Sequence, residues 1–151
     1  MPRVVKKPGD VLQFPVEASL HSYAQWLPNS DVRVFSILTD TAWPIAGIVT
    51  LPVAFRVPIL RRSPGLSGWS KVGNAPVPDE YLVKPCYAHQ DRFSGAISIY
   101  ENGVLRPATF DQAVDLEPLA VWEHPHIVDR LLATIHGRPS NFLESLRIKA
   151  A

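Results

Sequence analysis

The chain has 151 residues, of which 46% are hydrophobic and 19% charged, and its formal net charge is +1 at pH 7. This length and composition predict a single domain over residues 1–151 with a core at about 9–146, and they argue against disorder, coiled coils and collagen-like repeats. The near-neutral charge offers no large basic surface, so we expect neither nucleic acid nor an anionic membrane as a partner.

The one cysteine, Cys86, excludes an intrachain disulfide, and the N-terminal residues lack the pattern of a secretory signal. The longest apolar stretch, residues 44–55, is interrupted by Pro and Gly and is shorter than the roughly 20 residues of a membrane-spanning helix. We therefore expect a cytoplasmic protein that does not enter a membrane.

Apolar and polar residues alternate over 11–16 and again over 53–59, which predicts two strands with one buried face each. Residues 32–38 are almost continuously apolar, the pattern of a strand that is covered on both sides. A further short strand is expected over 69–73. The 15 prolines, about twice the ordinary frequency of ~5%, argue against long helices before residue 120.

The dipeptide Asn102-Gly103 is the clearest turn signal, because both residues tolerate the positive φ angles of a tight hairpin. It would join a strand at 96–100 to one at 104–106. The chain should therefore contain about six strands, mostly antiparallel.

Helical spacing appears only near the end of the chain. The apolar residues from Ile127 to Ile135 share one helical face, Pro125 suits a first turn and Gly137 suits a helix end. A second short helix is expected near Asn141, with Glu144 as a capping-box partner. The predicted fold is α+β: a bent antiparallel sheet or a partly open small β-barrel, with C-terminal helices packed on one side.

The sequence gives little support for a metal site. His126 and His136 are ten residues apart, about 15 Å along a helix, so they and the neighbouring His124 cannot share an ion. Cys86 and His89 lack the second ligand pair of a structural zinc site. We expect no metal and no cofactor.

A nucleophilic site would pair Cys86 with a histidine and an aspartate such as Asp91 or Asp129. A chain of this size offers such trios by chance, and a cysteine beside Pro85 and Tyr87 is more often a small buried hydrophobe. We therefore expect no catalytic residues and no enzymatic activity.

Partner-binding candidates come from the aromatic and basic residues. Tryptophan both fills cores and anchors interfaces, and we expect Trp26 or Trp43 to be accessible. Arg61 and Arg62, with Lys71 near them in sequence, could meet an acidic partner surface, although a solvated sheet edge is an equally good interpretation.

Short motifs follow one another in a fixed order along the second half of the chain. They are Gly68-Trp69-Ser70-Lys71-Val72-Gly73, Gln90-Asp91, Ser98-Ile99-Tyr100, Leu105-Arg106-Pro107-Ala108-Thr109, Ala120-Val121-Trp122-Glu123 and His126-Ile127-Val128-Asp129-Arg130-Leu131. Together with Gly9-Asp10-Val11-Leu12, this order resembles the immunity protein 26 family of bacterial polymorphic toxin systems. One departure lies at residues 17–30, where the family pattern implies a tight hairpin with glycine and this chain has Glu17-Ala18-Ser19-Leu20-His21-Ser22.

The resemblance implies a cytoplasmic protein that binds a cognate toxin domain and neutralises it by stoichiometric inhibition. Two other functions stay open on the residues alone. A small-ligand or nucleic-acid binding module on a curved sheet would need a concave cleft lined by aromatic side chains. A hydrolase would need a histidine beside Cys86 or two carboxylates in a pocket. The toxin and the oligomeric state are left open.

Overall fold

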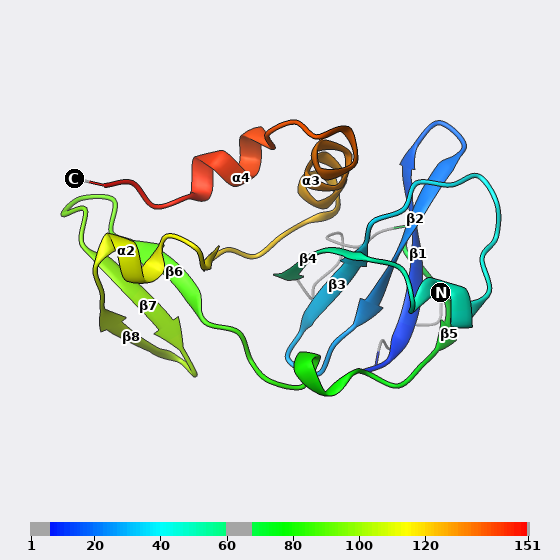
Figure 1. Cartoon of the computed structure of the whole chain (residues 1–151), viewed down its shortest axis with the longest axis horizontal. Coiled ribbons are helices and arrows are strands. Elements are labelled where there is room, and N and C mark those ends of the chain that lie inside the picture. The colour runs from blue at the N-terminus through cyan, green and yellow to red at the C-terminus, as the bar shows by residue number, and fades with distance from the viewer. Residues whose placement is uncertain (1–6, 60–67, 151) are drawn as a thin grey trace.

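The structure, a computed structural model, describes residues 7–59 and 68–150. The fold class is α+β, as predicted, but the strands form two sheets instead of one (Figure 1). The large sheet has the strand order β4-β3-β2-β1-β5 and the small sheet the order β8-β7-β6-β9; neither closes into a barrel. The strands are β1 (Asp10–Glu17), β2 (Leu20–Trp26), β3 (Asp31–Phe35), β4 (Val53–Pro58), β5 (Ser70–Asn74), β6 (Tyr87–Gln90), β7 (Ile97–Glu101), β8 (Val104–Pro107) and β9 (Glu117–Pro118).

The helices within the described residues are short. They are α1 (Ile45–Ile48), the 3-10 turn η1 (Asp79–Tyr81), α2 (Phe110–Ala113), α3 (His124–His136) and α4 (Asn141–Leu146). Helix α3 ends at Gly137 with φ of 66°, as its sequence predicted. Helix α4 is capped by Ser140, whose hydroxyl accepts from the Leu143 N–H, so the expected capping box with Glu144 is wrong. None of these helices is long and apolar enough to cross a membrane.

Four of the predicted strands lie in the large sheet as β1, β3, β4 and β5, and the two predicted beside Asn102-Gly103 lie in the small sheet as β7 and β8. Strand β3 is buried along its whole length between β2 and β4. The described residues hold nine strands where about six were expected. The three strands that the sequence did not predict are β2, with seven residues, β6, with four, and β9, with two. Strand β9 pairs in parallel with β6, and a segment of two residues carries no alternating pattern.

Both tight hairpins use residues with positive φ. Asn102 and Gly103 adopt φ of 50° and 82° between β7 and β8, as predicted. At the β1–β2 turn, Glu17 pairs with Leu20 while Ala18 takes φ of 47°. The hairpin therefore forms without the glycine that the family pattern implies, at the steric cost of a left-handed alanine.

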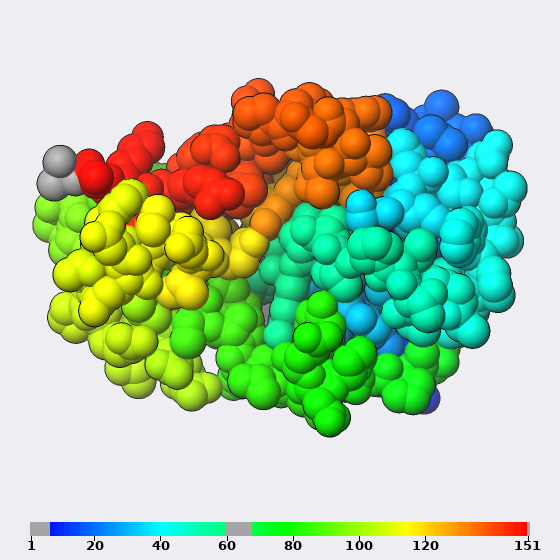
Figure 2. All heavy atoms as spheres, in the orientation of Figure 1, coloured from blue at the N-terminus to red at the C-terminus, as the bar shows by residue number. Residues whose placement is uncertain are grey.

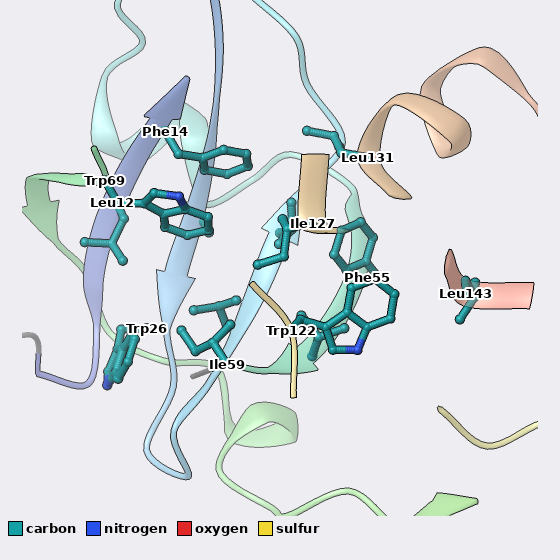
Figure 3. Packing of buried hydrophobic residues seen from close by; sticks show 14 residues of the cluster. Leu12, Phe14, Trp26, Phe55, Ile59, Trp69, Trp122, Ile127, Leu131 and Leu143 are labelled. Carbon is teal, nitrogen blue, oxygen red and sulfur yellow. The ribbon is translucent and has the colours of Figure 1, made fainter. Parts of the chain in front are cut away.

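The main core lies between the large sheet and α3, as expected for the C-terminal helix (Figure 3). Trp69 stacks on Phe14 with ring centroids 4.2 Å apart, and both are buried. Ile127 and Leu131, on the face of α3 that the sequence predicted, are fully buried in the same cluster. Helix α4 then leads from α3 towards the small sheet (Figure 1).

One arginine connects the two sheets. The Arg130 guanidinium on α3 donates to both carboxylate oxygens of Glu117 on β9, and it lies 4.5 Å from the Phe55 ring centroid on β4 and 5.1 Å from that of Trp122. The backbone N–H of Trp122 donates to the Pro58 carbonyl at 2.9 Å. The planar guanidinium group of arginine can bind a carboxylate through two hydrogen bonds and also stack on aromatic rings.

The contact predicts a measurable contribution to stability. We expect Arg130→Ala to lower the free energy of unfolding by about 3 kcal/mol, because it leaves Glu117 without its partner and removes the packing on two rings. Urea unfolding monitored by tryptophan fluorescence measures the change. The matched control is Arg147→Ala, whose exposed pair with Glu144 should contribute less than about 0.5 kcal/mol. Equal losses in the two variants would contradict a connecting role for Arg130.

A second prediction concerns His124, at the start of α3. Its Nδ1 accepts from the Trp69 indole N–H at 2.9 Å, so the ring is neutral, and burial lowers the pKa of His124. The unfolded chain then binds the proton more readily, and stability should fall as the pH drops below about 6.5. We expect the melting temperature to fall less between pH 7 and pH 5 in His124→Gln than in the wild type, since glutamine can accept the same bond without titrating. Parallel curves would contradict this assignment.

Candidate functional site

The most exposed large apolar side chain in the described residues is Phe93, at 100% relative exposure. It lies in the loop between β6 and β7. A single exposed apolar residue is ordinary on a protein surface, but an aromatic ring held on a rigid turn is a typical interface anchor. The question is therefore whether the loop is held in place.

The loop is braced by hydrogen bonds to Asp91. The Asp91 carboxylate accepts from the backbone N–H groups of Phe93 and Ser94, each at 2.8 Å. The backbone N–H of Asp91 donates to the Ala96 carbonyl, and Gly95, with φ of 74°, donates back to the Asp91 carbonyl. The hydrogen bonds from Ser94 and Phe93 lower the pKa of Asp91, so it stays ionised and keeps the turn closed.

A groove of about 570 Å³ lies beside this loop, between β6 and the segment that follows α4. Its basic lining residues are Arg92, Arg147 and Lys149, and its only acidic one is Asp91. Arg147 pairs with Glu144, whereas Arg92 and Lys149 have no ion pair with any described residue. The groove therefore presents positive charge next to the Phe93 ring.

The far wall of the groove is fixed to the sheet by Gln90. The side-chain amide of Gln90 donates to the Lys149 carbonyl and accepts from the Lys149 N–H, both at 2.9 Å. Ile148 is buried in the cluster that includes Ala88 of β6. The space-filling view shows this C-terminal segment crossing onto the lobe of the small sheet (Figure 2).

A second hollow, which we call the cleft, has a volume of about 250 Å³ and adjoins the groove. Its apolar walls include Tyr87 and Tyr100, with ring centroids 6.4 Å apart, and Pro58 and Pro85. Leu119, 37% exposed, lines both hollows. Burial raises the pKa of Tyr87, so its ring remains a neutral phenol. The cleft is thus walled mainly by aromatic and proline side chains.

Those residues predicted for partner binding that the structure describes do not line the groove or the cleft. Trp43 is 38% exposed, but Trp26 is buried at 7%, so Trp26 is withdrawn as an accessible anchor because it fills the core beside β1. Lys71 on β5 forms an ion pair with Asp10 at 3.1 Å. The pair Arg61-Arg62 lies outside the described residues. Trp26, Trp43 and Lys71 belong to the large-sheet part of the chain.

The residues considered for chemistry have other partners. Burial and the nearby Glu101 raise the pKa of the Cys86 thiol, which disfavours the thiolate. His124 accepts from Trp69, and His126 stacks on Phe142 at 3.7 Å between centroids. Within residues 7–59 and 68–150, no three His, Cys, Asp or Glu side chains are grouped so that they could hold a metal ion.

Most motif residues behind the family resemblance have structural roles. Asp10 accepts from Asn74, the Lys7 N–H and Lys71; burial opposes its ionisation, but these bonds together lower the pKa of Asp10. Thr109 caps α2 through a complete capping box. Sequence reasoning missed Phe93, although an aromatic residue inside the turn-forming run 91–95 was a usable signal.

No family model, curated protein or solved structure matches this chain. Phe93, the groove and the cleft lie on or beside the small sheet. We call the surface that they form the Phe93 face.

The bracing of the loop predicts a local effect of one substitution. In Asp91→Ala we expect faster amide hydrogen exchange at Phe93 and Ser94 and lower NMR order parameters across the loop, because both N–H groups lose their acceptor. Asp115→Ala, an exposed aspartate outside the loop, is the control. An unchanged loop in Asp91→Ala would show that the carboxylate does not hold it.

Proposed function

We propose that this protein is an immunity protein that binds a cognate toxin domain through the Phe93 face and neutralises it by stoichiometric inhibition. The observation that carries the proposal is a fully exposed phenylalanine on a braced loop beside a basic groove. The order of the sequence motifs supports the choice of partner. The toxin would be blocked at its active site or at a surface next to it.

The geometry is suited to tight binding. A phenylalanine buries on the order of 150 Å² or more in an interface, which at ~25 cal/mol per Å² corresponds to roughly 4 kcal/mol before the costs of association. A loop already held in one conformation loses little entropy on binding. A contact of standard size, about 800 Å² per partner, would extend from Phe93 over the groove and the cleft.

The raised pKa of Cys86 supports binding over nucleophilic catalysis. One observation favours the alternative of a small-ligand binding module: the cleft is concave and has two tyrosines in its wall. The two functions differ in their partner, since an immunity protein must rescue cells from a toxin and a ligand-binding module need not.

The deciding experiment is co-expression with the toxin domain encoded beside this chain, with host survival and co-purification as readouts. Survival together with a stoichiometric complex is the expected result. Cell death in the presence of both folded proteins, with no complex, would contradict the proposal and favour the ligand-binding alternative.

A single substitution tests the face itself. We expect Phe93→Ala to weaken the complex by about 30-fold or more, the ~2 kcal/mol typical of an aromatic hot spot, and to leave the melting temperature unchanged because the ring touches no core. The control is Val72→Ala on β5, an exposed apolar residue of the large sheet. Calorimetric titration of the toxin domain gives both dissociation constants, and equal effects of the two variants would remove Phe93 from the interface.

A further inference from the structure

We infer that the groove and the cleft form one continuous track that takes an extended acidic segment of the partner, with carboxylates along the groove and an aromatic or proline side chain in the cleft. Leu119 lines both hollows, so a bound segment would pass over this residue. The inference rests on the proposed function for the identity of the partner and adds the chemistry of the segment that is recognised.

The charge of the partner segment follows from the lining of the track. Lys84 lies at the cleft, and Arg92 and Lys149 lie at the groove beside Arg147, whose charge is balanced by its pair with Glu144; the single acidic lining residue is Asp91. One oxygen of Asp91 already accepts two loop N–H groups. The whole chain has a net charge of only +1, so this excess of positive charge is a local feature of the track. A carboxylate-bearing segment is its electrostatic complement.

The extended conformation follows from the edge of the small sheet. Strand β9 ends at Pro118, and the last bond along this edge runs from the Leu119 N–H to the Ala88 carbonyl at 2.8 Å. Alternation along β6 places the backbone N–H and C=O of Gln90 on the same edge, where no described residue bonds to them. An extended segment in the groove could pair with these groups as an added strand.

The cleft indicates where an apolar side chain of the partner segment would bind. Tyr87 and Tyr100 present ring surface next to Pro58 and Pro85, in a volume of about 250 Å³ that suits one side chain. Asn29 and Asn102 are its polar lining residues besides Lys84.

A basic track also has a consequence for the target: it does not match a positively charged nucleic-acid site, so a toxin nuclease would be contacted beside such a site and not in it.

The test uses the full chain and a defined peptide, acetyl-Phe-Gly-Asp-Glu-Asp-Glu-amide, together with the same residues in reverse order. The control peptide has Asn and Gln in place of Asp and Glu. We expect saturable NMR shifts of the amides of Gln90, Tyr100, Leu119 and Lys149 with one acidic peptide, and at least tenfold weaker binding of the neutral peptide. Raising the salt concentration should weaken the binding of the acidic peptide and leave the binding of the neutral peptide unchanged.

Matched charge reversals complete the test. Arg92→Glu and Lys149→Glu should each weaken the binding of the acidic peptide at least tenfold. Arg138 is exposed and does not line the track, so Arg138→Glu should leave the binding unchanged. Absence of saturable shifts with both acidic peptides, or equal binding of the neutral one, would overturn the track. Peptide binding without rescue from the toxin would instead refute the immunity function and leave the track standing, so the two failures are distinguishable.

Discussion

The structure depends on a single cation held between its two sheets. Arg130 contributes the only ionic contact of α3 to the small sheet among the described residues, and its guanidinium also covers Phe55 and Trp122 of the main core. Because Glu117 lies on β9, next to β6, this contact fixes the small sheet relative to α3. The backbone bond from Trp122 to Pro58 and the burial of Ile148 in the cluster of Ala88 are further contacts between the two parts of the chain.

The positions of the two sheets determine the geometry of the candidate site. One wall of the groove belongs to β6 and its loop, and the other follows α4, which α3 positions. Gln90 then joins the two walls through its bonds to Lys149. The groove, with its basic side chains, and the loop that carries Phe93 are therefore held in place by the same set of contacts, and a preformed surface loses little entropy on binding.

The sequence predicted local features better than long-range ones. The Asn102-Gly103 hairpin, the face of α3 and its end at Gly137 follow from φ preferences and helical periodicity, which act over a few residues. The division into two sheets and the contact of residue 90 with residue 149 depend on pairings that no local pattern encodes. The same limit explains why the site was not predicted. Tryptophan is a typical interface anchor, but Trp26 is buried, and the groove forms only where segments distant in the sequence meet. Many motif residues behind the family resemblance have structural roles, whereas the motif residues Gln90, Asp91 and Tyr100 line the groove or the cleft, and Phe93 lies outside the motifs.

Hydrogen–deuterium exchange of this chain with and without the toxin domain encoded beside it tests whether the Phe93 face is the interface. The Phe93 face predicts protection of residues 88–95 and 145–150 in the complex, with little change around Trp43 and β5. Protection confined to the large sheet, or none in the presence of a stoichiometric complex, would contradict the account.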